Sequence, residues 1–202
     1  MDLITLIYTE EEKNLIEQLH CQEWTLSQSG RLKQDFSPQV NYKRRKIKFD
    51  NYKGLPAYSK ALIKRMRELE ILKDFIPVAQ TNLEYDPLRG AGIDRHKDDD
   101  WIWGDRISVL SLRSDTVIRF YNSERSIHDS FVLLVPLPSR SLLVFSGLAR
   151  YDWEHAIFYS DIIQKRISIT WRELGPLFKN GGPEEHIGSI LKHKVLPTLD
   201  LS

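Results

Sequence analysis

The sequence predicts an α+β fold in which helices come first and a jelly-roll core follows. Helical periodicity is strongest in the first 70 residues, which contain two amphipathic patterns. From about residue 78 onward, short β-rich runs follow one another and are separated by proline, glycine and serine turns. Strands at such close spacing indicate a sandwich or barrel, and not a sheet built from β-α-β units.

Two helices are predicted before the β-rich part. After a short strand at 3–8, Thr9 and Glu12 form a capping box, which is typical of a helix start. Pro56 precedes the second helical pattern. The apolar residues in phase are Leu15, Ile16 and Leu19 in the first helix and Leu62, Ile63, Met66 and Leu69 in the second. Each helix therefore has one apolar face, which we expect to pack against the outside of the core.

Residues 24–51 interrupt the helical part. They are polar and basic and contain serine, glycine and proline, so they predict a long loop or an irregular hairpin. The β-rich runs that follow are 78–85, 107–112, 116–121, 130–135, 141–145, 154–159 and 166–171. After residue 174 the pattern weakens, and only 184–194 predicts a short helix.

The length predicts one domain over residues 1–202, with a helical part at 1–77, a core at 78–174 and a tail at 175–202. No apolar run approaches the roughly 20 residues that cross a bilayer, so no membrane partner is expected. The first residues lack the basic start and small-residue cleavage site of a secretory signal. The single cysteine, Cys21, excludes an intrachain disulfide. These features predict a protein of the cytoplasm or nucleus.

Two histidines and one aspartate are candidate metal ligands. His96 and Asp98 are two residues apart, so in an extended segment both side chains point the same way and reach one ion. Asp100 has the same parity and is an alternative ligand. His155 comes from a later predicted strand, and distant strands lie side by side in a jelly roll. Two imidazoles and one carboxylate hold one face of an octahedral Fe(II) and leave the opposite face open for substrate and oxygen.

Arg166 and Arg172 delimit a run in which polar and apolar residues alternate. An amphipathic strand with a solvated polar face is the commoner explanation of such a pattern. The alternative is that the two guanidinium forks bind both ends of a small dicarboxylate, because each fork matches a carboxylate through two parallel hydrogen bonds. The polar face consists of Arg166, Ser168, Thr170 and Arg172. A metal, an organic acid and an open coordination position together imply oxidation by molecular oxygen.

The net charge of +1 hides an uneven distribution. Five cationic residues lie between Tyr42 and Phe49, namely Lys43, Arg44, Arg45, Lys46 and Lys48. A solvated loop, or an edge strand that its cations protect from further pairing, explains this run. A surface that faces the substrate is the alternative.

These motifs in combination resemble the AlkB family of Fe(II)- and 2-oxoglutarate-dependent dioxygenases. The resemblance covers roughly residues 24–174. The pieces that carry it are His96-Lys97-Asp98, the segment from Ser146-Gly147 to His155, and the strand from Arg166 to Arg172. Within the family, five stretches are similar to the AlkB homologue 4 branch. They are SQSGRLKQDF (27–36), GLPAYS (54–59), NLEYDP (82–87), HKDDDWIWGDRI (96–107) and SLLVFSGLARYDWEHAI (141–157).

The resemblance implies a double-stranded β-helix, which is another name for the jelly roll, and the cofactors Fe(II), 2-oxoglutarate and O2. It implies that His96, Asp98 and His155 hold the iron and are the catalytic residues. The far carboxylate of 2-oxoglutarate would pair with Arg166, helped by Tyr85 and Thr170, and Arg172 would lie near the other end of the diacid.

One spacing departs from the pattern of the family. Many relatives place an Asn-x-Tyr motif at the co-substrate. Here the spacing from Asn82 to Tyr85 is one residue longer. Tyr85 is therefore the residue carried over from the resemblance.

The resemblance further implies an oxidative N-demethylase that releases formaldehyde from methylated DNA of the N6-methyladenine type. The basic run favours nucleic acid, because cations bind phosphates and aromatic rings stack on bases. The candidate substrate residues, with the loop at 24–51, are Tyr42, Lys43, Arg44, Arg45, Lys46, Asp99 and Trp101.

Two alternatives remain open from the sequence. The first is a methylated lysine on a protein, which favours an aromatic and acidic pocket. Trp101, Trp103, Asp99 and Asp100 follow the metal motif and would supply such side chains, and the alternative is that both tryptophans are buried in the core. The second is a non-catalytic jelly-roll binding module that uses its metal site for structure.

Overall fold

The computed structural model describes residues 2–122 and 131–199. Two compact units interleave along the chain. The first comprises residues 1–34, 82–98 and 107–170, and the second 35–81, 99–106 and 171–202. The single domain predicted over 1–202 stays a prediction.

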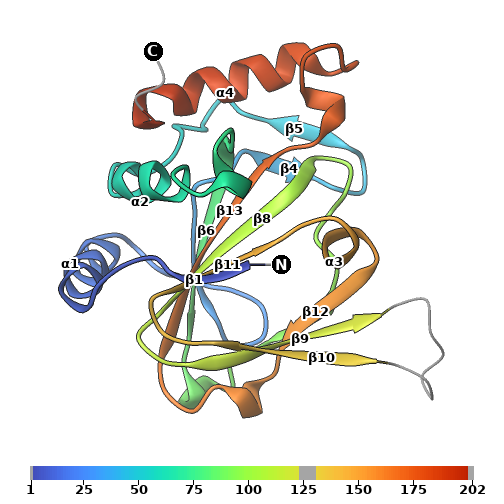
Figure 1. The fold of residues 1–202 in the computed structure, drawn as a ribbon. Helices are drawn as coiled ribbons and strands as arrows, with labels where there is room; N and C mark the ends of the chain where they lie inside the picture. The colour runs from blue at the N-terminus through green and yellow to red at the C-terminus, as the bar shows by residue number, and fades with distance from the viewer. Residues whose placement is uncertain (1, 123–130, 200–202) are drawn as a thin grey trace. The chain divides into compact units, whose positions relative to one another are not determined.

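Within the described ranges, the strands form two large sheets and one two-stranded hairpin (Figure 1). One sheet has seven strands in the order β1-β11-β8-β13-β6-β3-β2, and the other has four in the order β10-β9-β12-β7. The strands of the first sheet are β1 (Asp2–Thr5), β2 (Thr25–Leu26), β3 (Leu32–Asp35), β6 (Pro77–Tyr85), β8 (Trp103–Leu112), β11 (Ser141–Phe145) and β13 (Arg166–Leu174). Those of the second are β7 (Ile93–His96), β9 (Thr116–Asn122), β10 (Val132–Leu137) and β12 (Trp153–Ile157). The chain crosses repeatedly between sheets, as a jelly roll requires, so the predicted fold is confirmed.

The core of the first unit lies between its two sheets. Both sheets contribute apolar side chains that are almost fully buried, because alternate residues of each strand point inward. The buried members are Tyr85, Ala91, Ile107, Ile118, Phe120, Leu137, Leu143, Phe145, Ile157 and Ile162. The candidate site described below lies at the edge of this apolar interior.

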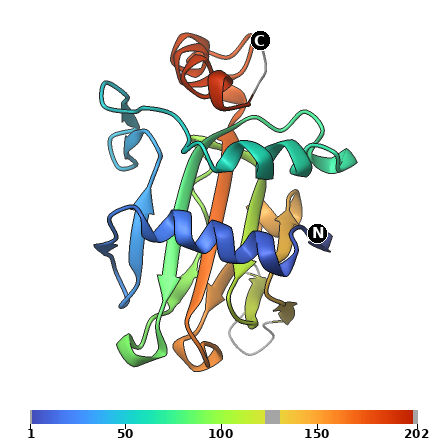
Figure 2. The same cartoon turned by 90° about the vertical axis from the view of Figure 1, so that its left-hand side faces the viewer.

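Helix α1 (Thr9–His20) runs across the seven-stranded sheet (Figure 2). The helix begins where predicted, but its capping residues differ. The Tyr8 backbone N–H donates to Glu11 Oε2 at 2.8 Å, so the capping box assigned to Thr9 and Glu12 is wrong by one residue. Glu12 is instead buried, and its Oε1 accepts hydrogen bonds from the Arg113 backbone N–H at 2.6 Å and the Ser139 hydroxyl at 2.8 Å.

The second unit contains helices α2 (Ser59–Met66) and α4 (Glu185–Leu199), which contact each other. Helix α4 is longer than the predicted 184–194, so most of the expected tail is helical. The described short helices are η1 (Glu70–Leu72) and η4 (Pro176–Phe178) here, and η2 (Pro87–Arg89), η3 (Tyr159–Asp161) and α3 (Leu148–Tyr151) in the first unit. None of the helices in the described ranges is long and apolar enough to span a bilayer.

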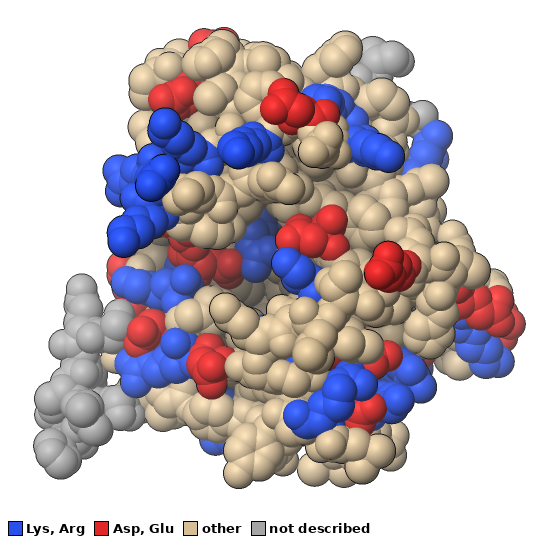
Figure 3. Space-filling model, turned by 180° about the vertical axis from the view of Figure 1, so that it is seen from behind, with Lys and Arg blue, Asp and Glu red and all other residues tan. Residues whose placement is uncertain are grey.

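Residues 24–51 form strands where the sequence predicted a loop or an irregular hairpin. They contribute β2 and β3 to the large sheet, and β4 (Gln39–Asn41) pairs with β5 (Lys46–Lys48) as a separate hairpin. The tip is a tight turn in which the Arg44 N–H donates to Asn41 Oδ1 at 2.9 Å, and Arg45 adopts a positive φ of 47°. Figure 3 shows Lys and Arg side chains gathered at the upper left, where this hairpin lies.

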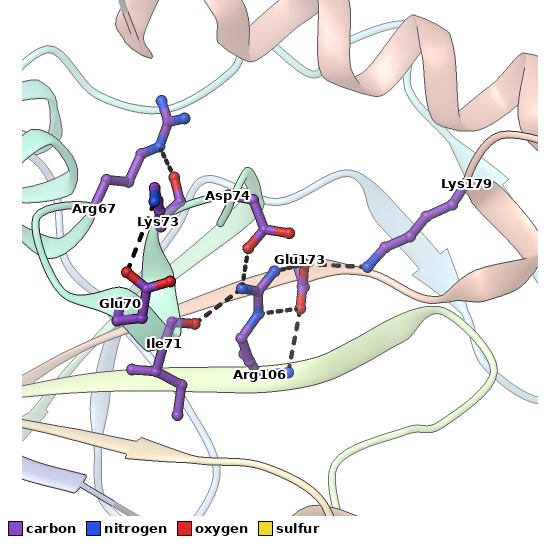
Figure 4. Close-up of polar contacts among 8 residues, drawn as sticks. All are labelled: Arg67, Glu70, Ile71, Lys73, Asp74, Arg106, Glu173 and Lys179. Carbon is purple, nitrogen blue, oxygen red and sulfur yellow. Dashed lines mark hydrogen bonds and ion pairs between the residues drawn. The ribbon is translucent and has the colours of Figure 1, made fainter.

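A charged cluster joins β8 to β13 within the second unit (Figure 4). Arg106 Nε and Nη2 donate in parallel to the two carboxylate oxygens of Glu173, both at 2.8 Å. Lys179 Nζ lies 3.2 Å from the same carboxylate, and Arg106 also bonds Asp74 and the Ile71 carbonyl. Burial raises the pKa of the Glu173 carboxyl, but the bonds and charges of Arg106 and Lys179 outweigh burial and hold its pKa below the ordinary value.

Replacing Arg106 with methionine should lower the free energy of unfolding by about 3 kcal/mol, because it leaves Glu173 buried with Lys179 as its one remaining counter-ion among the described residues. Urea unfolding measures the loss. Lys13→Met is the control, since Lys13 and Glu10 form an exposed pair whose loss should cost less than about 1 kcal/mol. Equal losses in the two variants would contradict the role assigned to Arg106.

Candidate functional site

His96 and His155 are brought together by strand pairing. In the antiparallel pair of β7 and β12, His96 lies directly opposite His155. Residues in such positions project from the same face of the sheet, with Cβ atoms about 4.5–5.5 Å apart. The two imidazole ring centroids are 4.3 Å apart. The pairing thus places two nitrogen ligands side by side although 58 residues separate them in sequence.

Asp98 completes a group of three ligands. One donor atom from each of His96, Asp98 and His155 lies within 4.8 Å of the others, and His155 Nε2 is 3.7 Å from Asp98 Oδ2. Small side-chain shifts bring such donors to the spacing of about 3 Å that a shared ion with bonds of about 2.1 Å requires. Among the described residues the group contains no other His, Cys, Asp or Glu, so Asp100, the alternative ligand, is not part of it. The donor set fits Fe(II).

The tautomer of His96 suits metal binding. Its Nδ1 lies 2.8 Å from the Asp94 carbonyl oxygen. A carbonyl oxygen only accepts hydrogen bonds, so Nδ1 must carry the proton and donate. Nε2 then keeps its lone pair for an ion, and the bond fixes the plane of the ring.

Aromatic side chains surround His155 on the core side. His155 also pairs with Phe120 of β9, and the rings of Phe120 and Phe145 lie 5.8 Å and 5.2 Å from its imidazole. His155 is 8% exposed, and both phenylalanines are almost fully buried. The candidate metal ligands therefore lie at the edge of an apolar interior that limits the access of water.

Arg166 is a buried cation with unused donors. Its side chain is fully buried at the start of β13, where Nε donates to Ser111 Oγ at 3.1 Å. Within the described residues, neither Nη1 nor Nη2 has a hydrogen-bond partner. Burial lowers the pKa of the Arg166 guanidinium, and the Tyr85 phenol acts in the opposite direction. Two unsatisfied buried donors on a cation fit the carboxylate of a diacid such as 2-oxoglutarate.

Tyr85 lies close to Arg166, and the roles of Tyr85 and Thr170 at 2-oxoglutarate stay predictions. The guanidinium carbon of Arg166 is 5.0 Å from the centre of the Tyr85 ring. Thr170 shares the face of Arg166 on β13, and its side chain is buried. The solvated polar face considered for this strand is thus excluded at Arg166, Ser168 and Thr170, which are all buried.

Asn82 cannot join Tyr85 at this position. The two residues are three apart on β6 and so point to opposite faces of the sheet. The Asn82 side chain donates to Gln34 Oε1 at 2.8 Å, away from the jelly-roll core that contains Tyr85. The longer spacing in this sequence therefore separates the two residues of the usual motif.

Other predicted site residues lie in the second unit. Arg172 is half-buried near the end of β13, and its role at 2-oxoglutarate stays a prediction. Asp99 Oδ1 accepts hydrogen bonds from the backbone N–H groups of Trp101 and Ile102, and the Trp101 ring packs edge-on against Phe178. Tyr42 and the four cations that follow it are exposed.

Three contributors to the site are not evident from the sequence. They are the Asp94 carbonyl, the aromatic pair Phe120 and Phe145, and Arg150, whose Nη1 donates to the Asp98 carbonyl at 2.9 Å. Strand periodicity marks the two phenylalanines as inward-facing but does not reveal that they face His155. The other two contacts leave no signal in sequence spacing.

Comparison with known proteins agrees with this geometry. No family model matches the chain. A mouse protein named alpha-ketoglutarate-dependent dioxygenase alkB homolog 4 is 37% identical over 213 residues, which cover 93% of this chain and 71% of the mouse protein. The human protein of that name is 38% identical over 90% of this chain and 69% of its own length. This chain belongs to the AlkB family of 2-oxoglutarate-dependent dioxygenases.

A further relative and two solved structures are consistent with this membership. A Caenorhabditis elegans protein named DNA N6-methyl adenine demethylase is 37% identical over 90% of this chain and 63% of its own length. The structure of OsALKBH1 superposes with a TM-score of 0.61 at 11% identity, over 85% of this chain and 97% of that chain. A Pseudomonas putida prolyl-4-hydroxylase gives a TM-score of 0.55 at 15% identity, over 85% and 90%. These two structures support the jelly-roll fold.

Because the AlkB family is a family of dioxygenases, this AlkB-family chain is an enzyme. The alternative of a non-catalytic binding module is therefore wrong. The family implies Fe(II), 2-oxoglutarate and O2 as cofactor and co-substrates. The three clustered ligands fit the metal, and the unsatisfied donors of Arg166 fit the diacid.

Asp98→Ala should abolish succinate formation while the protein stays folded, because Asp98 supplies the only negative ligand of the triad. Calorimetric titration with Mn(II), which needs no turnover, should show loss of the site. Asp100→Ala is the matched control and should bind Mn(II) as the wild type does. Full turnover by Asp98→Ala with added iron would refute the assignment.

Arg166→Met should abolish binding of 2-oxoglutarate and at the same time stabilise the ligand-free protein by about 1–3 kcal/mol, because it removes unsatisfied buried donors. Calorimetry and urea unfolding measure the two effects. Arg119→Met is the control with the opposite sign, since Arg119 bonds both carboxylate oxygens of Asp161. Loss of stability in Arg166→Met, or unchanged affinity, would contradict the role of Arg166.

Proposed function

We propose that this AlkB-family chain is an oxidative N-demethylase that acts on methylated DNA, with N6-methyladenine as the target base. The main support is the exposed basic turn at the tip of the β4–β5 hairpin. The name of the worm relative, DNA N6-methyl adenine demethylase, points to the same substrate. The expected localisation in cytoplasm or nucleus also stays a proposal.

The β4–β5 hairpin has the properties of a phosphate-binding element. Lys43, Arg44, Arg45 and Lys46 are consecutive and exposed, and the tight turn holds their charges close to one another. Like charges at such spacing repel, and a polyanion relieves the repulsion and releases its own counterions on binding. Tyr42, which is 50% exposed, offers a ring on which a base can stack.

A methylated lysine on a protein is the second candidate substrate. It calls for a cage of aromatic and acidic side chains that faces solvent. Of the residues considered for such a cage, Trp103 is buried, Trp101 packs against Phe178, and Asp99 accepts backbone hydrogen bonds within its own turn. Because these side chains are buried or already in contact with other groups, nucleic acid is favoured over methyl-lysine as the substrate.

The residues of the chain would divide the work of the reaction. His96, Asp98 and His155 would hold the metal, and Arg166 would orient the diacid through its far carboxylate. The apolar core next to His155 would exclude water from the oxidation. When bound, iron, 2-oxoglutarate and oxygen supply the oxidising chemistry, which converts 2-oxoglutarate to succinate and carbon dioxide and hydroxylates the N-methyl group. The hydroxymethyl group then leaves as formaldehyde.

Formaldehyde release separates the candidate substrates. With Fe(II), 2-oxoglutarate and ascorbate, the enzyme should release formaldehyde from an oligonucleotide that contains N6-methyladenine, at a rate well above that with a methyl-lysine peptide. Release from the peptide alone would favour the second candidate. Succinate without formaldehyde from either would show that the enzyme is active but that both substrate assignments are wrong.

Neutralising the hairpin should weaken DNA binding and its salt dependence. In a triple variant of Lys43, Arg44 and Arg45 to glutamine, the slope of log K against log salt should fall by about 0.7–0.9 for each phosphate that the hairpin no longer neutralises. A triple variant at the exposed residues Lys13, Lys60 and Lys64 is the matched control. Equal slopes in both variants, measured by fluorescence anisotropy, would exclude the hairpin from the DNA interface.

A further inference from the structure

We propose that Arg150 is a positioning residue for the metal centre, which holds the segment that carries Asp98 against the segment that carries His155. Arg150 is 2% exposed, which is unusual for an arginine. Its Nη1 donates to the Asp98 backbone carbonyl at 2.9 Å, and its guanidinium carbon lies 5.1 Å from the centre of the Tyr151 ring. The contact therefore reaches the main chain of a metal ligand.

The Asp98 backbone depends on such a contact because Asp98 does not belong to a helix or a strand. Strand β7 ends at His96, and residues 97–99 have no regular secondary structure. The imidazoles of His96 and His155 are set by strand pairing, whereas the direction of the Asp98 side chain depends on its local backbone. A charge-assisted hydrogen bond to the Asp98 carbonyl restricts rotation of the Asp98 backbone and thereby sets the orientation of its carboxylate.

The local sequence explains how Arg150 reaches this position. Gly147 has φ 56° and ψ −133°, a backbone conformation that is essentially restricted to glycine. It turns the chain out of β11 into α3, where the Arg150 and Tyr151 N–H groups both donate to the Gly147 carbonyl. Arg150 thus lies five residues before His155 on a short, fixed connection to β12. One side chain thereby links the segments of two ligands.

Positioning and simple electrostatics predict opposite effects on metal affinity. A buried cation beside a metal site repels a dication, so on charge alone Arg150→Met would tighten metal binding. If Arg150 instead orients the Asp98 carboxylate, Arg150→Met weakens metal binding. The loss should be about 10- to 100-fold, as for other residues that orient metal ligands. The sign of the change thus separates the two explanations.

Calorimetric titration of the full chain with Mn(II), without oxygen, 2-oxoglutarate or DNA, tests the proposal. Arg150→Met should bind Mn(II) about 10- to 100-fold more weakly than the wild type. The Fe(II) concentration for half-maximal succinate release should rise by a similar factor, while the rate at saturating Fe(II) is largely kept. Arg119→Met is the matched control, since Arg119 also lies over an aromatic ring, that of Phe158, but donates its side-chain hydrogen bonds to Asp161.

Unchanged or tighter Mn(II) binding by Arg150→Met, or an equal loss in Arg119→Met, would overturn the proposal. If Arg150→Met does not fold, Arg150→Lys decides, because lysine keeps the charge but not the planar fork. Weaker Mn(II) binding by Arg150→Lys than by the wild type supports positioning, and equal binding contradicts it. The inference depends on the metal centre and not on the substrate, so failure of the DNA assay leaves this test intact.

Discussion

The antiparallel register of β7 and β12 is the constraint on which the site depends. It sets His96 opposite His155, and a slip of one residue would turn one imidazole to the other face of the sheet. Pairing of β12 with β9 on its other side adds Phe120 to the same row. These two strand pairings thus fix two of the candidate metal ligands and part of their apolar surroundings. The direction of the third candidate, Asp98, depends on other contacts.

Arg166 is a buried residue that we expect to lower the stability of the ligand-free protein. A buried guanidinium whose terminal nitrogens lack partners destabilises the ligand-free protein, whereas the bidentate pair of Arg106 and Glu173 is satisfied and stabilises the strands that it joins. Two arginines of one sheet therefore have opposite effects on the stability of the protein. The chain supplies the counter-ion of Arg106, whereas we propose that the carboxylate of a bound co-substrate supplies that of Arg166.

Much of the fold and of the site could be predicted from the sequence. Alternation along β13 and the spacing of the turns identified most strands, and the His-x-Asp motif with a later histidine identified the ligands that the structure gathers. Strand β7 was missed because its residues, Ile-Asp-Arg-His, lack apolar alternation. The strands in 24–51 were missed because they are short and polar. Contacts such as those of Arg150 and Glu12 join segments that are far apart in sequence, and the local sequence pattern carries no information about them.

A crystal of the protein grown without oxygen, with Mn(II) and 2-oxoglutarate, tests the central claim most directly. The anomalous signal of manganese should lie within bonding distance of His96 Nε2, an Asp98 carboxylate oxygen and a ring nitrogen of His155, and the far carboxylate of the diacid should contact Nη1 and Nη2 of Arg166. Manganese bound elsewhere, or a diacid that leaves both nitrogens of Arg166 without a partner, would contradict the account.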